Sequence, residues 1–230
     1  MLVCSAGCRR CPPIISGLRS AVRRGESGTA NIYFEEGPAA GDGHYLDHFT
    51  GPSRTWIRTV ESSKPQLVQT SDICEEKKRW LQAALPAVGP RSIDCYGKYG
   101  VYNYGKTKVL LHYYARYLDV GTAKDLHELS RAEQMDLDIV LQLRKDESEL
   151  TVLWRGKPAS NRTVYVRGPK KLRKNLKTDE KGSVRFTPEN AGRYTFRTSA
   201  EKATPGRDGD EEYSLIRHNG TLVMTLLVKK

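Results

Sequence analysis

The clearest pattern in the chain is an alternation of apolar and polar residues between residues 135 and 230. Residues 137–143 place four apolar side chains on one side of a predicted strand, and residues 221–228 repeat this alternation near the C-terminus. Further strands are predicted at 149–154, 163–167, 184–186 and 194–196. Glycine and proline turns separate these strands at spacings of about 8 to 12 residues, which is typical of an antiparallel β-sandwich. We therefore expect a sandwich domain over residues 135–230.

Residues 29–130 also favour strands, with short helical segments between them. Strands are predicted at 30–35, 55–60, 65–70 and 107–117, and the tyrosine- and glycine-rich residues 94–118, which include the last of these strands, suit a hairpin. Helical turns are predicted at 44–49 and at 78–85, where Pro86 ends the second. The expected fold class is all-β, with two β-sandwich-like domains at 29–130 and 135–230 and short helical insertions.

The first 28 residues continue neither pattern. They contain Cys4, Cys8 and Cys11 in the spacing C-x3-C-x2-C, which can hold an iron–sulfur cluster. The residues before Cys8 also resemble the small-residue motif of a lipoprotein signal. Cluster chemistry of this kind normally sits in a large α/β barrel, and the stretch before Cys8 is too short for the apolar segment of a signal peptide. We expect a disordered tail or a misassigned start in 1–28, and free thiols at Cys74 and Cys95.

The formal charge of +11 is concentrated in one stretch of the chain. Residues 155–185 hold eleven Lys and Arg against two acidic residues, a net charge of +9. Within them, the run 170–177 is expected to form a basic hairpin tip. This tip is either simply solvated or a contact for the cell surface, with an envelope protein or an anionic glycan as partner. It contains no aromatic residue that could stack on bases, so no nucleic acid is expected. No apolar run reaches the roughly 18 to 20 residues of a transmembrane helix, so no membrane span is expected.

Several motifs resemble known families. The turns Trp154-Arg155-Gly156-Lys157-Pro158, Thr178-Asp179-Glu180-Lys181-Gly182 and Ala191-Gly192-Arg193-Tyr194 resemble those of Ig-like, carboxypeptidase-regulatory-like sandwiches. The segments Asn31-Ile32-Tyr33-Phe34-Glu35-Glu36, Tyr99-Gly100-Val101, Leu111-His112-Tyr113-Tyr114-Ala115 and Ser214-Leu215-Ile216-Arg217-His218 resemble a bacterial family of extracytoplasmic domains of unknown function, loosely described as associated with nickel or cobalt uptake. This resemblance, over about residues 30–230, implies a periplasmic or extracellular protein that is an accessory to transition-metal uptake. Members of the family open with a signal peptide and an early His, and residues 1–28 have neither.

Five residues are candidates for a transition-metal site. His44 and His48 are spaced i, i+4 around Asp47, so on a helix both imidazoles share one face and can bind Ni, Co, Cu or Zn. The alternative for these three is a solvated helix face. His112 and His218 lie in stretches that carry the family resemblance, and each is either a metal ligand or a structural residue of a sheet.

The sequence contains none of the common catalytic motifs, such as Gly-x-Ser-x-Gly, the Walker loop, His-Glu-x-x-His or Gly-x-Gly-x-x-Gly. We therefore expect a non-enzymatic protein. It is either an accessory to nickel or cobalt uptake or a module that binds an envelope protein or glycan. A metal-dependent enzyme is a third hypothesis, and it requires His44 and His48 to converge with His112 or His218 around one concave pocket.

Overall fold

The computed structural model describes residues 19–24, 28–35, 41–49, 53–62, 64–85, 89–144 and 147–227. The strands of the first half are β1 (Arg19–Arg24), β2 (Thr29–Glu35), β3 (Arg54–Thr59), β4 (Gln66–Val68), β5 (Thr70–Glu75), β6 (Lys78–Ala84), β7 (Arg91–Tyr104) and β8 (Thr107–Asp119). Those of the second half are β9 (Leu137–Leu143), β10 (Ser148–Trp154), β11 (Lys157–Pro158), β12 (Thr163–Arg167), β13 (Arg173–Lys177), β14 (Ser183–Phe186), β15 (Gly192–Asp208) and β16 (Glu211–Leu226).

The helical elements within the described residues are short. They are the 3-10 helices η1 (His44–His48) and η2 (Pro169–Lys171) and the α-helix α1 (Ala123–Leu129), which begins at a capping box formed by Thr122 and Asp125. The predicted all-β class is therefore confirmed. No helix in this part of the chain is long and apolar enough to cross a membrane.

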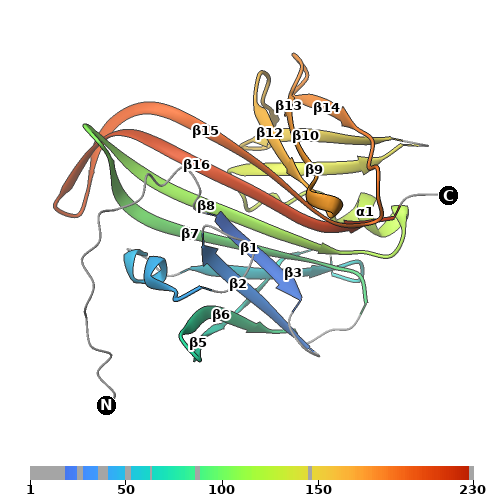
Figure 1. Ribbon diagram of the computed structural model, residues 1–230, viewed down its shortest axis with the longest axis horizontal. Helices are drawn as coiled ribbons and strands as arrows, with labels where there is room; N and C mark the ends of the chain where they lie inside the picture. Colours follow the sequence, from blue (N-terminus) through green and yellow to red (C-terminus); the bar gives the residue numbers. More distant parts are fainter. Residues whose placement is uncertain are drawn as a thin grey trace.

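An eight-stranded sheet runs through the centre of the molecule (Figure 1). Its strand order is β13-β12-β15-β16-β8-β7-β3-β4, and β16 pairs with β8 in parallel, whereas the other neighbours with a described register are antiparallel. Strand β8 belongs to the predicted domain 29–130 and β16 to the predicted domain 135–230. The division into two domains stays a prediction, but strands from both parts share this sheet.

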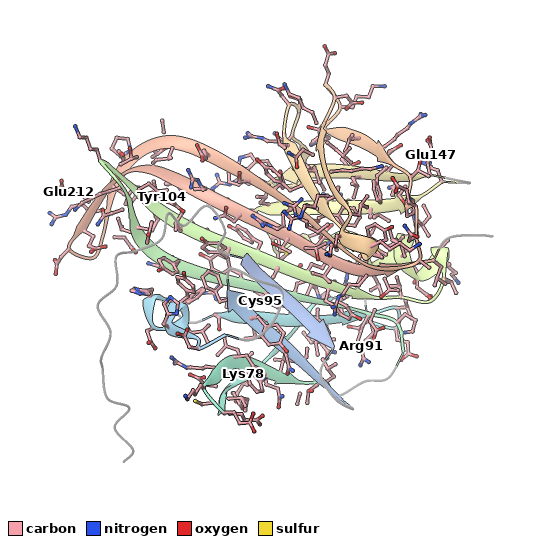
Figure 2. All side chains as sticks on the ribbon, viewed as in Figure 1. Lys78, Arg91, Cys95, Tyr104, Glu147 and Glu212 are labelled. Carbon is pink, nitrogen blue, oxygen red and sulfur yellow. The ribbon has the colours of Figure 1, made fainter. Side chains whose placement is uncertain are left out.

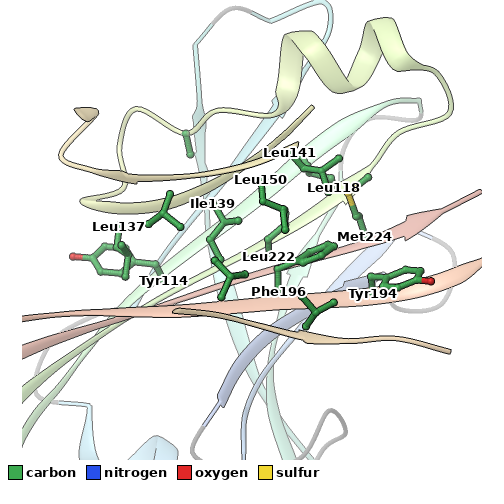
Figure 3. Close-up of a cluster of buried hydrophobic side chains, with 14 of the residues drawn as sticks. Tyr114, Leu118, Leu137, Ile139, Leu141, Leu150, Tyr194, Phe196, Leu222 and Met224 are labelled. Carbon is green, nitrogen blue, oxygen red and sulfur yellow. The ribbon is translucent and has the colours of Figure 1, made fainter. Parts of the chain in front are cut away.

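Each face of the central sheet is covered by a smaller sheet. Strands β9, β10, β11 and β14 form one cover, and the core beneath it includes Phe196, Leu222 and Leu150 (Figure 3). Burying one such side chain stabilises the fold by about 1.5 to 3 kcal/mol. Strands β1, β2, β6 and β5 form the other cover, below the central sheet in Figure 1. Strand β8 is buried on both faces, which explains why residues 109–118 are almost continuously apolar or aromatic.

Strands β15 and β16 extend past the two covers as a long hairpin arm. Glu212 lies near the tip of this arm in Figure 2. Strand β12 pairs with β15 only as far as Arg197, and beyond that residue no described strand lies on the outer edge of β15. The β15–β16 register shifts between Ala203 and Gly206, a bulge that contains Pro205.

Three local predictions need correction or completion. Residues 78–85 were predicted to be helical, but 78–84 form β6, because Leu81 pairs with both Ile32 of β2 and Asp72 of β5. The run 170–177 is not a hairpin tip. Its first two residues belong to η2, and residues 173–177 form β13, the edge strand of the central sheet. Within the predicted tail 1–28, residues 19–24 instead form β1, paired with β2.

The cysteines of the described part are free thiols, as predicted. Cys74 is exposed on β5 and Cys95 is buried on β7. Burial raises the pKa of the Cys95 thiol to about 11, so this sulfur is protonated and unreactive at neutral pH. The prediction for Cys4, Cys8 and Cys11 lies outside the described residues.

Candidate functional site

The parallel pairing of β16 with β8 brings His218 beside His112. The two residues are register partners, and their rings stack with centroids 4.7 Å apart and planes 9° apart. They are 106 positions apart in the chain, so only the parallel pairing creates this contact. Two of the five predicted site residues therefore lie together on one face of the central sheet.

Two tyrosines fix the orientation of these histidines. Tyr96 Oη lies 2.9 Å from His112 Nδ1, and Tyr114 Oη lies 3.0 Å from His218 Nδ1, both hydrogen-bond distances. The rings of Tyr96 and Tyr114 are themselves 5.2 Å apart, since these residues are partners across β7 and β8. The Nε2 atoms of both histidines make no hydrogen bond within the described residues, which leaves them available to a ligand.

Burial keeps all four of these side chains uncharged at neutral pH. Desolvation, with smaller contributions from His112 and Arg155, lowers the pKa of His218 to about 3. Desolvation also lowers the pKa of His112, and Lys98 adds to the effect. Burial raises the pKa of Tyr96 and of Tyr114. The site therefore presents neutral imidazoles and phenols, which exchange hydrogen bonds but carry no charge.

These four residues line a pocket of about 430 Å³ that opens beside the central sheet. We call it the histidine pocket, and its described lining residues are Arg54, Trp56, Tyr96, His112, Tyr114, Gln134, Asp136, Arg155, Ile216 and His218. Arg54 and Trp56 come from β3, where register places them on the same face as Tyr96. The segment between α1 and β9 contributes Gln134 and Asp136, and the turn after β10 contributes Arg155.

The polar rim of the histidine pocket contains two arginines and one carboxylate. Arg155 has a left-handed φ of 49°, a conformation that non-glycine residues rarely adopt, in the tight turn between β10 and β11. This turn sets its guanidinium 5.2 Å from the ring centre of Trp154 and 3.4 Å from Asp136 Oδ2. Arg54 is exposed and forms no ion pair within the described residues. An arginine of this kind is free to contact a polar ligand at the rim.

A buried ionic network supports the floor of the histidine pocket. Arg116 donates to Asp94 Oδ1 at 2.8 Å and lies 3.0 Å from Asp138 Oδ1, and all three side chains are almost fully buried. Gln134 links this network to the pocket, because its Nε2 donates to Asp94 Oδ2 at 2.8 Å. The buried Oε1 of Gln134 has no partner in the structure. Gln134 thus combines one satisfied amide group with a buried, unpaired acceptor next to the pocket.

The other three predicted site residues lie on η1, on the opposite face of the central sheet. His48 stacks on Tyr99 with a centroid distance of 5.2 Å, and Tyr99 belongs to the core under the β1–β2 cover. His44 contacts Asp42 at 2.5 Å, and Asp47 forms an ion pair with Arg79 at 2.5 Å. His112 points to the other side of β8, as the alternation with buried Leu111 and Tyr113 requires. The structure thus does not bring His44 or His48 together with His112 or His218.

The geometry of the histidine pair is unsuited to chelating one metal ion. A metal ion lies close to the ring plane of each imidazole that binds it, along the nitrogen lone pair, and two stacked, nearly parallel planes do not meet at a common point. Among the described residues, no group of three or more His, Cys, Asp or Glu side chains is placed to hold a metal. The metal predictions for His44, Asp47, His48, His112 and His218 stay predictions.

Sequence reasoning missed most of the pocket lining. It singled out His112 and His218 but not Tyr96, Tyr114 or Trp56. The alternation in 107–117 places residues 112 and 114 on one face, so this pattern could have identified Tyr114 as a neighbour of His112. Arg155 was seen only as part of a turn. Its contact with Asp136 depends on tertiary folding, and no local pattern carries that information.

Comparisons with known proteins give no family and no close relative. No family model and no curated protein matches the chain. Two structures of a pullulanase from Anoxybacillus sp. LM18-11, one complexed with maltotriose, are 12% identical over 79% and 78% of the chain, with a TM-score of 0.23, and the match spans about a quarter (24%) of the pullulanase length. The FN1–FN3 domains of chicken CNTN1 are 11% identical with a TM-score of 0.21, and the match covers 91% of this chain and 64% of that one. Similarities this low carry no argument about fold or ligand.

Proposed function

We propose that this chain is a non-enzymatic, extracytoplasmic β-sandwich protein that binds a saccharide unit of a cell-envelope glycan in the histidine pocket. The observation that carries the proposal is the lining itself, in which Trp56, Tyr96 and Tyr114 lie beside the neutral, unpaired Nε2 atoms of two histidines. A sugar ring has an apolar face that packs on aromatic rings and hydroxyl groups that exchange hydrogen bonds with uncharged polar groups. The aromatic rings and uncharged polar groups of the histidine pocket therefore complement a sugar ring.

Size and chemistry favour a small polar ligand over a large apolar one. The volume of about 430 Å³ falls in the range typical of small-molecule sites. Gln134, Asp136, Arg54 and Arg155 supply planar polar groups around the aromatic wall. Such groups orient a hydroxylated ligand by paired hydrogen bonds, which an apolar ligand cannot form.

The same lining supports binding rather than hydrolysis. Glycosidases generally use two carboxylates that flank the bond to be cleaved, whereas Asp136 is the only carboxylate among the described residues of the pocket. His218 is a poor general acid at neutral pH, because its lowered pKa leaves it deprotonated. No pair of groups with opposite proton-transfer roles is therefore available.

A role as an accessory to nickel or cobalt uptake is the second candidate function. One observation favours it: imidazoles bind transition metals in their neutral form, and both His112 and His218 are neutral with Nε2 unoccupied. This role requires the stacked rings to separate and turn toward a common ion. The saccharide proposal requires no such rearrangement, and for that reason we favour it.

Isothermal titration calorimetry of the full chain separates the two candidates. A panel of mono- to tetrasaccharides of hexoses, N-acetylhexosamines and uronic acids is titrated against the wild type and against Trp56→Ala. We expect at least one sugar to bind with a Kd between about 10 μM and 1 mM, and the variant to lose about tenfold or more. Trp80→Ala is the matched control, since Trp80 lies on β6 outside the pocket, with its ring centre 6.5 Å from that of Tyr33.

Two results would overturn the saccharide proposal. The first is the absence of sugar binding tighter than about 1 mM, and the second is an equal loss of binding in Trp56→Ala and Trp80→Ala. Titration with Ni²⁺, Co²⁺, Cu²⁺ and Zn²⁺ completes the experiment. Metal binding tighter than about 100 μM that is abolished by His218→Gln would replace the saccharide role with the metal role.

A further inference from the structure

The outward face of β12, β13 and β15 is strongly basic. Every second residue of these strands points outward, and ten such residues make up this face: Thr163, Tyr165, Arg167, Arg173, Asn175, Lys177, Arg193, Thr195, Arg197 and Ser199. Five of them are Lys or Arg and none is acidic. We call this surface the basic sheet face. It lies on the opposite side of the sheet from the core residues Val164, Val166 and Phe196, which alternate with its members.

The register places these cations close together on a flat grid. Arg167 is the direct partner of Arg173, and Tyr165 lies between Asn175 and Arg197. Direct partners across strands are about 5 Å apart at Cβ, and alternate residues along a strand are about 7 Å apart. Like charges directly opposite each other destabilise a sheet. The fold itself therefore gains nothing from placing Arg167 beside Arg173.

Two acidic residues near the basic sheet face pair with cations that are not members of it. Glu189 pairs with Lys174 at 2.6 Å, and Glu201 pairs with Arg217 at 2.5 Å. Asp179 accepts the backbone N–H groups of Lys181 and Ser183 in the turn after β13. Within the described residues, Arg167, Arg173, Lys177 and Arg193 form no ion pair. The face therefore keeps a positive potential that attracts an extended anion.

The composition of the basic sheet face selects among anionic polymers. Single-stranded nucleic acid is usually held by several aromatic side chains on which bases stack, and this face has only Tyr165, which is 39% exposed. Membrane surfaces are bound by basic segments that also insert apolar side chains, and besides Tyr165 the uncharged positions here are Thr, Asn and Ser. Guanidinium groups match carboxylate and sulfate oxygens in paired hydrogen bonds.

We propose that the basic sheet face binds an anionic polysaccharide through its carboxylate or sulfate groups. This inference goes beyond the proposed function. The histidine pocket takes a single saccharide unit on the other face of the sheet, whereas this surface takes a charged polymer chain. The arginines of β15 lie about twenty residues after those of β13 in the sequence, so only the folded sheet brings them together on one face.

Affinity electrophoresis and calorimetry of the full chain test this proposal, with heparin and oligogalacturonate of about ten sugars as probes at 50 and 200 mM NaCl. The variant Arg173→Gln/Lys177→Gln changes two exposed residues of the edge strand, and Arg193→Gln changes β15. We expect each variant to weaken binding of at least one probe, by about tenfold or more for the double variant. Binding should weaken with salt, and less steeply in the double variant because fewer ions are displaced.

Lys78→Gln/Lys106→Gln is the matched control, because it removes two exposed charges away from the face; we expect less than a twofold change. Equal losses in both double variants would show that only net charge matters and would overturn the proposal, as would no binding of either probe at 50 mM NaCl. Tighter binding of a 20-nucleotide single-stranded DNA, or of phosphatidylglycerol vesicles, would overturn the choice of partner. Trp56→Ala should leave polymer binding unchanged, so failure of the pocket proposal and failure of this one are distinguishable.

Discussion

Two stacked imidazoles repel each other when both are protonated, so the environment of His112 and His218 must disfavour their charged forms. It does so mainly by burial, and each ring gains a hydrogen bond from its tyrosine neighbour rather than from a carboxylate. The carboxylates of Asp136 and Asp208 favour the charged form of His112, but burial outweighs them. The arrangement makes the protonation state of two residues depend on the integrity of the fold.

We predict that His218 makes the protein less stable as the pH falls. The unfolded chain protonates this residue near pH 6.5, but the folded chain does so only near pH 3, so the unfolded state binds more protons between these values. The free energy of unfolding should fall by up to about 1.4 kcal/mol per pH unit from this residue across that window. Urea unfolding of wild type and His218→Gln at pH 7, 6 and 5 measures the difference in slope.

The control for this measurement is His127→Gln, at an exposed position on α1. It should retain the wild-type dependence on pH, whereas His218→Gln should show a shallower one. Identical slopes in all three proteins would mean that His218 is protonated as readily in the folded chain as in the unfolded one.

At the scale of elements, η1 is held against β7 by a position that only glycine fills. A Cβ at Gly97 would lie 2.2 Å from Cε1 of Phe49, at the end of η1, and Phe49 packs edge-on against Phe34 of β2 at 4.5 Å. The aromatic core between the β1–β2 cover and the central sheet therefore depends on one missing methyl group. Close approach of a ring to a strand is a common reason for glycine in a sheet.

We predict that Gly97→Ala destabilises the protein by about 1 to 3 kcal/mol, because the Phe49 ring must leave its position. The free energy of urea unfolding measures the change. Gly121→Ala serves as the control, since nothing lies within 4 Å of a Cβ there. The double variant Gly97→Ala/Phe49→Ala should lose little beyond the cost of Phe49→Ala alone; a fully additive loss would show that the clash is not the cause.

The elements that the sequence predicted correctly are those whose signal is local. Alternation located strands such as β9 and β12, and the helical turn predicted at 44–49 agrees with η1. Because η1 is a 3-10 helix, the i, i+4 spacing of His44 and His48 does not place both imidazoles on one face. Strand β6 was missed because its backbone is set by pairing with β2 and β5 rather than by its own weak periodicity. The parallel contact of β16 with β8, which creates the histidine pocket, joins residues more than one hundred positions apart and leaves no trace in either segment alone.

At the scale of the whole molecule, the shared central sheet and the buried Arg116 network tie both covers together. Asp94 lies on β7, Arg116 on β8 and Asp138 on β9, so the network spans the central sheet and the β9–β10 cover. Cys95, next to Asp94, faces the opposite cover. A disturbance at Arg116 therefore reaches both layers through one strand pair.

We predict that Arg116→Met destabilises the protein by about 3 to 5 kcal/mol, because Asp94 and Asp138 are left buried without a counter-charge. Both covers should unfold together. The urea midpoint measured by circular dichroism should then equal the midpoint at which the buried thiol of Cys95 begins to react with a thiol reagent. Arg116→Met/Asp94→Asn/Asp138→Asn should recover part of the loss. Two separated midpoints would show instead that the layers fold independently.

The open edge of the β15–β16 arm has a consequence for self-association. A strand whose outer N–H and C=O groups have no partner is a template onto which a second molecule can add a strand, and repetition of that step produces fibrils. Pro205, which has no N–H donor, lies in the bulge between Ala203 and Gly206, and this bulge interrupts the regular spacing of the strand. These features oppose the addition of a strand at this edge, so we expect a chain in which they are replaced by a regular, uncharged strand to be prone to polymerise along the arm.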